Sequence, residues 1–151
     1  MRRIVEMSGL NWDTRCPWGN GSLGEALLTP TRIYVKGAVA AMRANALHGL
    51  AHITGGGLTE NLPRALPEGL GAEIDLASWR LPPVFKWLVS QGGLEQSELL
   101  TTFNAGIGMV AIAPPEKVDT ARHHFAEQGC EVFEIGRVID GEAIIYNGSL
   151  S

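Results

Sequence analysis

Apolar and polar residues alternate along the chain in short blocks that predict a mixture of helices and strands. Val39, Met42 and Ala46 recur at steps of three and four residues, which predicts a helix from Val35 to about Asn45. Alternating or continuous apolar residues predict strands over 50–54, 72–76, 103–112, 131–138 and 142–146, with a central strand at the apolar end of 103–112. Further helices are expected over 2–7, 22–28, 58–66, 82–92, 96–100 and 114–128. This order predicts an α+β fold with a mixed β-sheet covered by helices.

Local signals divide the chain into two parts. Gly9 is expected to end the first helix, and because that helix begins without a cap we expect it to be the end of a longer upstream helix. The Gly- and Pro-rich stretch 11–21 predicts a surface loop, held to the core by Trp12 and Trp18. Residues 1–21 are therefore interpreted as a helix end and loop, and 22–151 as one α+β domain.

Composition and charge narrow the functional classes. The 151 residues carry a net charge of −4 and are 45% hydrophobic and 19% charged, which is typical of a globular domain and unlike a nucleic-acid-binding one. No apolar run reaches membrane-spanning length. The two cysteines, Cys16 and Cys130, are far apart in sequence, which favours a reduced, cytoplasmic protein. We expect neither a nucleic acid nor a membrane as partner.

The triplet Gly55, Gly56 and Gly57 is the first candidate site. It lies between a predicted strand and a predicted helix, where bare amides can converge on a phosphate. Thr54 can add a hydroxyl to the same surface. Glu60, Asn61 and Arg64 follow at helical spacing, and Arg64 can neutralise a phosphate. The plain alternatives are a turn that binds nothing and a solvated helix face with a Glu60–Arg64 pair.

Other clusters are discounted, and no metal site is predicted. His48 and His52 lie on a turn and a strand, so they cannot share a helical face as zinc ligands. His123 and His124 are adjacent in a predicted helix and diverge by about 100°. Glu73 is interpreted, together with its neighbour Asp75, as the polar side of an edge strand rather than as an acid–base pair.

Three segments in order closely resemble the C-terminal half of aminoimidazole ribonucleotide (AIR) synthetase, also called phosphoribosylformylglycinamidine cyclo-ligase. They are Leu28–Val35 (LTPTRIYV), His52–Arg64 (HITGGGLTENLPR) and Thr102–Met109 (TFNAGIGM). Ala105 stands where cysteine is frequent in relatives. Nothing in these residues resembles the family's N-terminal domain, which holds most ATP contacts and the acidic Mg²⁺ ligands and forms the homodimer. The resemblance therefore implies an isolated C-terminal domain of that fold, inactive alone.

For the complete enzyme, the resemblance implies ring closure of formylglycinamidine ribonucleotide in purine biosynthesis. ATP phosphorylates the formyl oxygen, the amidine nitrogen attacks the activated carbon, and phosphate leaves. The chain's share of this chemistry is positioning and charge stabilisation. The expected catalytic residues are His52 and Asn104. The expected substrate- or phosphate-binding residues are Thr31, Arg32, Thr54, Gly55, Gly56, Gly57, Glu60, Asn61, Arg64 and Gly106.

Two alternatives stay open. The chain can be a non-catalytic module that binds phosphate or nucleotides. It can also belong to a related ATP-dependent synthetase that makes selenophosphate, thiamine diphosphate or formylglycinamidine ribonucleotide. Residues 29–34 and 103–109 favour the cyclo-ligase.

Overall fold

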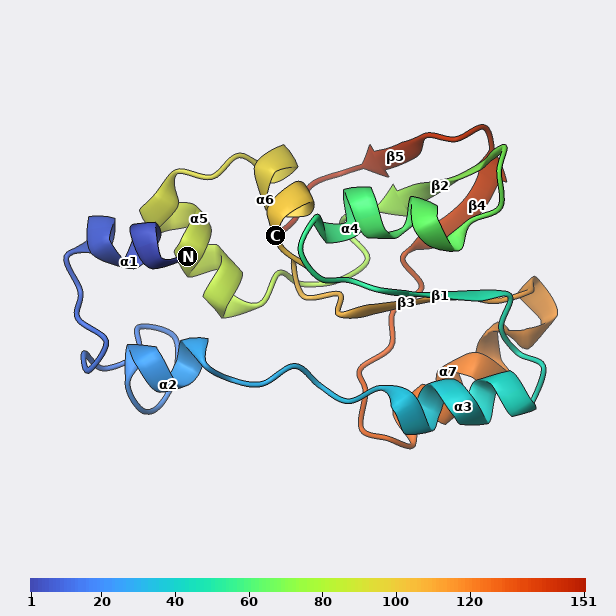
Figure 1. The fold of residues 1–151 in the computed structure, drawn as a ribbon, viewed down its shortest axis with the longest axis horizontal. Coiled ribbons are helices and arrows are strands. Elements are labelled where there is room, and N and C mark those ends of the chain that lie inside the picture. Colours follow the sequence, from blue (N-terminus) through green and yellow to red (C-terminus); the bar gives the residue numbers. More distant parts are fainter.

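In the computed structural model, which describes residues 1–151, five strands divide into two small sheets (Figure 1). β1 (Gly49–His52) and β3 (Met109–Ile112) form an antiparallel ribbon. In the second sheet, β2 (Leu70–Asp75) pairs antiparallel with β4 (Gly136–Asp140) and parallel with β5 (Ile144–Asn147). The predicted α+β class with a mixed sheet and helices is confirmed. The strands form two sheets instead of one.

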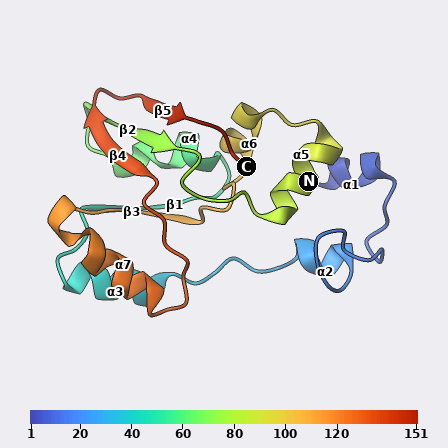
Figure 2. The ribbon, with the colours of Figure 1, turned by 180° about the vertical axis from the view of Figure 1, so that it is seen from behind.

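Helices lie on both sides of the β1–β3 ribbon (Figures 1 and 2). On one side, α3 (Val35–Arg43) packs against α7 (Val118–Ala126), which follows the short 3₁₀ helix η2 (Pro115–Lys117). On the other side lie α4 (Gly57–Asn61) and the 3₁₀ helix η1 (Pro63–Ala65), in the same layer as the three-stranded sheet. The ribbon is thus the middle layer of the domain.

The N-terminal helices form a separate group at one end of the molecule (Figure 1). α1 (Arg2–Ser8) packs against α5 (Pro83–Gly92), with α2 (Leu23–Leu27) close by. α6 (Gln96–Thr102) follows α5 and packs against α4. An extended segment, 28–34, runs from α2 to α3. No helix of the molecule is both long and apolar enough to cross a membrane.

The main hydrophobic core joins the ribbon to the three-stranded sheet. Leu58 and Leu62 of the α4 region are almost completely buried, together with Leu76 and Leu99. A smaller cluster of Ala38, Ala41 and Phe125 fills the contact between α3 and α7. Burial of each large side chain stabilises the fold by about 2 kcal/mol, so the larger cluster dominates. It fixes the position of the residues that follow β1.

Local end signals were predicted correctly. The Ser22 hydroxyl accepts a hydrogen bond from the Glu25 amide at 3.2 Å, and the Glu25 carboxylate accepts one from the Ser22 amide at 2.9 Å. This capping box begins α2. Gly9 ends α1 with φ +71°, a left-handed conformation that glycine adopts without strain.

Three predictions about element length are wrong. The strand expected over 103–112 begins only at Met109, and it belongs to a two-stranded ribbon instead of being a central strand. The helix expected over 58–66 is interrupted at Pro63, which lacks an amide hydrogen and begins η1 instead. The strand expected over 131–138 begins only at Gly136, although the Ile135 carbonyl accepts the Asp75 amide at 2.8 Å. Of the two tryptophans expected to hold the 11–21 loop, Trp18 packs on Trp87, with ring centroids 5.1 Å apart, and Trp12 is 47% exposed.

The edge-strand interpretation of Glu73 is also wrong, because β2 is the central strand of its sheet. The Glu73 carboxylate accepts hydrogen bonds from Arg137 Nε of β4 and Asn147 Nδ2 of β5, both at 2.8 Å. The Arg137 guanidinium also forms an ion pair with it. One side chain of the central strand therefore links both neighbouring strands.

We expect this link to make stability depend on pH. Hydrogen bonds from Arg137 and then Asn147 lower the pKa of Glu73 below its ordinary value of 4.5. A carboxylate with a lowered pKa in the folded state contributes stability above its unfolded pKa, and that contribution is lost as the pH falls through the folded pKa. Glu73→Gln should therefore destabilise the protein at neutral pH and have little effect at a pH well below 4.5.

Urea unfolding of wild type and Glu73→Gln at both pH values measures this difference. Glu68→Gln is the matched control, because Glu68 is exposed and forms no ion pair. An equal effect of Glu73→Gln at both pH values would show that the link contributes nothing through charge.

Candidate functional site

The antiparallel ribbon brings two of the predicted segments to one end. His52 at the end of β1 pairs with Met109 at the start of β3, and the Ile53 amide donates to the Gly108 carbonyl at 3.0 Å. The residues after β1 therefore lie beside the residues before β3. This places the glycine turn, residues 54–57, next to the Asn104–Gly108 segment.

The glycine turn has a conformation that side chains would not tolerate. Gly56 and Gly57 have φ of +94° and +57°, in the left-handed region. The Gly57 amide donates to the Thr54 carbonyl at 3.0 Å, and Gly57 lies against the backbone carbonyls of Leu100 and Phe103. The amides of Gly55 and Gly56 have no partner within the protein. The turn thus offers two free N–H donors on a rigid backbone.

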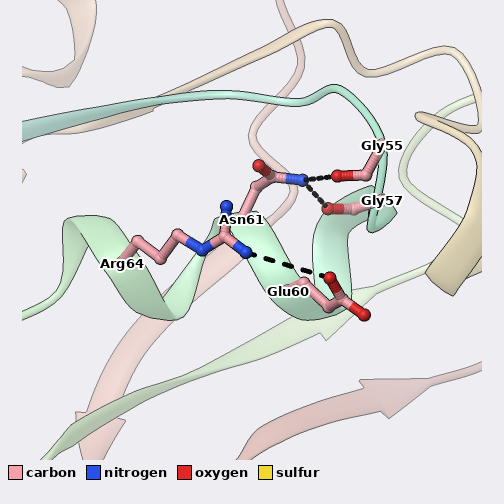
Figure 3. Close-up of polar contacts among 5 residues, drawn as sticks. All are labelled: Gly55, Gly57, Glu60, Asn61 and Arg64. Carbon is pink, nitrogen blue, oxygen red and sulfur yellow. Dashed lines mark hydrogen bonds and ion pairs between the residues drawn. The ribbon is translucent and has the colours of Figure 1, made fainter.

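Asn61 holds the turn through its side-chain amide (Figure 3). Its side-chain Nδ2 donates to the Gly55 carbonyl at 3.1 Å and to the Gly57 carbonyl at 2.8 Å. It is only 8% exposed and is the one buried polar side chain of the chain. Both N–H groups of its amide are used inside the protein, so the arrangement gives Asn61 a structural role. Contact with a substrate stays a prediction.

Glu60 lies next to the same turn. A side chain added at Gly56 would meet the Glu60 carboxylate, so that carboxylate sits against the turn. Arg64 Nη2 lies 3.9 Å from Glu60 Oε2, and both side chains are more than half exposed (Figure 3). A negative charge here opposes the binding of a phosphate to the free amides. An anion can use this turn only if the exposed Glu60 side chain swings away.

The Asn104 segment forms a second tight turn. Ala105 and Gly106 both have positive φ, +49° and +97°, and the Ile107 amide donates to the Asn104 carbonyl at 2.9 Å. The Asn104 side-chain oxygen accepts the Gly106 amide at 3.1 Å. The side-chain N–H groups of Asn104 have no protein partner, so they can donate to a ligand.

The segment Leu28–Val35 reaches the same end of the ribbon through Tyr34. Its ring meets the His52 ring edge-on with centroids 6.0 Å apart, and its hydroxyl lies against Gly108. Thr31 and Arg32 are exposed on the approach to α3, where Arg32 Nη1 donates to the Gly129 carbonyl at 2.7 Å. Tyr34 and Gly108 belong to the sequence motifs, but neither was predicted as a site residue.

A groove of about 1190 Å³ runs beside the ribbon and contains only part of the predicted site. Its lining includes Arg32, Arg64 and Gly106 of the predicted residues, as well as Tyr34 and Gly108. The glycine turn, His52 and Asn104 lie outside it. Arg64 is also distant from Arg32 along the ribbon, because its neighbour Ala65 approaches Gly49 at the start of β1 while Tyr34 contacts His52 at the end.

The usual metal-ligating side chains are dispersed in this structure. No group of three or more His, Cys, Asp or Glu side chains converges anywhere in the molecule. Mg²⁺ is held mainly through carboxylates and phosphate oxygens. The groups that the site offers are hydrogen-bond donors and the positive charge of Arg32 and Arg64.

The fold and the site define an α+β domain in which three polar segments converge at the end of a two-stranded ribbon. Residues 1–147 match the family described as AIR synthase related protein, C-terminal domain, and the chain belongs to this family.

Solved structures agree on the fold. Thiamine-monophosphate kinase from Stenotrophomonas maltophilia K279a aligns with 99% of this chain at a TM-score of 0.66 and 18% identity. The tt0281 protein from Thermus thermophilus aligns with 76% at a TM-score of 0.51 and 22% identity. The alignments span 46% and 36% of those two chains, so this chain covers less than half the length of either.

Proposed function

We propose that this chain acts as the C-terminal domain of an AIR synthetase, which closes the imidazole ring of formylglycinamidine ribonucleotide at the expense of ATP. One observation carries the proposal: the three segments that resemble this enzyme, 28–35, 52–64 and 102–109, contact one another at one end of the β1–β3 ribbon, where Tyr34 lies against His52 and Gly108, and Gly57 lies against Phe103. Segments far apart in sequence that converge with unpaired polar groups are expected of a binding site.

In this proposal, the chain's residues bind and orient the substrate. Asn104 donates its free amide hydrogens to an oxygen of the substrate, because its own oxygen is held by Gly106. His52, exposed at the end of β1, serves as donor or proton carrier. The free amides of Gly55 and Gly56 receive a phosphate oxygen when Glu60 moves aside, and Arg64 compensates the charge. Fixed donors of this kind accelerate a reaction by positioning the reacting groups.

ATP and Mg²⁺ are proposed to be held mainly by a further domain of a longer protein, since no acidic cluster forms in this chain. That domain, a second copy of the longer protein and the ribonucleotide are the proposed partners. Apolar side chains on segment 28–42 are available for such contacts: Leu28 and Ile33 are each 81% exposed, and Val35 is 63% exposed. A cytoplasmic location stays a prediction.

The proposal is tested on the proposed longer protein, in which this chain is joined to an ATP-binding domain, and on the 151-residue chain itself. With ATP, Mg²⁺ and formylglycinamidine ribonucleotide, the longer protein should release one phosphate for each aminoimidazole ribonucleotide formed. The 151-residue chain should form none. Thiamine monophosphate is the competing substrate, because the aligned Stenotrophomonas protein is a thiamine-monophosphate kinase.

Phosphorylation of thiamine monophosphate by the longer protein, with no ring closure, would overturn the proposal. Product formation by the 151-residue chain alone would overturn the proposal that ATP and Mg²⁺ are held mainly by a further domain. Binding of the ribonucleotide by the longer protein without turnover would favour a non-catalytic module, for which the free amides of Gly55 and Gly56 are the supporting observation.

A further inference from the structure

Tyr34 carries an unused polar group at the end of the ribbon. Its ring packs in the small cluster of Ala38, Ala41 and Phe125 and against His52. Its hydroxyl forms no hydrogen bond with any protein atom, whereas the hydroxyl of Tyr146, the other tyrosine of the chain, is 3.0 Å from Thr59 Oγ1. A half-buried hydroxyl without a protein partner is free to bind a ligand.

The backbone leaves space for this hydroxyl at one position. A Cβ atom at residue 108 would collide with the Tyr34 hydroxyl and would lie 3.1 Å from its Cζ atom. Gly108 does not have a positive φ, so its backbone does not require glycine. The absence of a side chain at 108 is therefore explained by the approach of Tyr34.

The surroundings define the ligand chemistry. Tyr34, Gly106, Gly108 and Arg32 all line the groove beside the ribbon. Burial raises the pKa of Tyr34 above its ordinary value of 10.0, with a further increase from Cys130 and an opposing effect of Arg32. The hydroxyl is thus protonated at neutral pH and donates a hydrogen bond, and the nearby guanidinium favours a negatively charged acceptor.

We propose that the Tyr34 hydroxyl, which occupies the space left by the missing side chain at Gly108, donates a hydrogen bond to an anionic oxygen of the substrate. The inference rests on the proposed function, which supplies a phosphorylated ribonucleotide as the substrate. It adds a binding residue that lines the groove, which the residues of the glycine turn do not line.

The test is a titration of the 151-residue chain with formylglycinamidine ribonucleotide and, separately, with inorganic phosphate. Backbone amide shifts at Gly106 and Gly108 report binding by NMR. Tyr34→Phe keeps the ring and removes only the oxygen, and it should raise the Kd for the ribonucleotide about tenfold, the usual effect of losing a hydrogen bond to a charged group. Tyr146→Phe is the matched control: it loses the bond to Thr59 but should leave the Kd unchanged.

A double variant separates ligand contact from general disturbance. Gly108→Ala should weaken binding because the added carbon displaces the hydroxyl. Combined with Tyr34→Phe, it should cause a smaller loss than it causes alone, because the oxygen it displaces is already absent and only the ring, with Cζ 3.1 Å from the added carbon, remains to be crowded. Independent, additive losses would overturn the inference.

The outcomes also distinguish the inference from the proposed function. Equal ribonucleotide affinity of wild type and Tyr34→Phe overturns the role of Tyr34 and leaves the function standing. Phosphate binding that depends on Tyr34, without ribonucleotide binding, supports Tyr34 and overturns the function. A wild-type chain that binds neither ligand overturns both.

Discussion

Gly57→Ala is expected to lower the free energy of unfolding by about 3 kcal/mol, the combined cost of a left-handed alanine and of an overpacked contact. Gly57 has φ +57°, and a Cβ atom there would collide with the Leu100 carbonyl and approach the Phe103 carbonyl. Both are backbone atoms of the α6 region, so they cannot rotate away as a flexible side chain would. The glycine turn would have to separate from α6.

Urea unfolding followed by circular dichroism measures this loss. Gly55→Ala is the matched control two residues away, where the backbone has no positive φ and no atom lies within 4 Å of an added carbon. It should change stability by no more than about 0.5 kcal/mol. If both variants unfold at the same urea concentration, the close packing of the turn against α6 is refuted.

Asn61→Asp should also destabilise the chain, by about 3 kcal/mol at neutral pH. The substitution replaces the two N–H groups that bind the Gly55 and Gly57 carbonyls with a carboxylate, which faces those oxygens at an almost buried position. The loss should be smaller in acid, because a protonated carboxyl can donate one of the two hydrogen bonds. Chemical denaturation at neutral and acidic pH gives both values.

Asn20→Asp is the control for this change, because Asn20 is exposed in the N-terminal loop and forms no hydrogen bond. It should be nearly neutral. The same small effect at both asparagines would show that the Asn61 amide does not stabilise the turn.

The sequence predicts best those features that depend on neighbouring residues. Ser22 and Glu25 lie three apart, and their reciprocal hydrogen bonds are the ones that this spacing predicts. Gly9 ends α1 for an equally local reason. The division of the strands into two sheets could not be predicted, because it depends on contacts between β2 and strands more than 60 residues later. Alternation of apolar and polar residues indicates a strand, but it does not indicate which strand pairs with it.

The candidate site shows the same limit. Its glycine triplet was proposed because turns have strong local signatures. Asn104 was proposed only from the family resemblance, since 103–112 was predicted as a strand. The sequence placed Glu60 and Asn61 on the helix after the turn, but it did not reveal that Asn61 points back to hold the turn or that Glu60 covers Gly56. Tyr34 and Gly108 were missed as site residues because they come together only in the folded chain, where residues over 70 positions apart are in contact.

The central position of β2 has a consequence for the synthesis of the protein. Its two partners are the last strands of these 151 residues, and the amides of Leu76 and Leu81 bind the carbonyls of Asn147 and Ser151 at 2.9 Å. The β1–β3 ribbon can form once residue 112 has left the ribosome, but β2 gains its first partner only with β4, which ends at Asp140, and its second only with β5, which ends at Asn147. During that interval, the nascent chain exposes a strand that is open to wrong pairing.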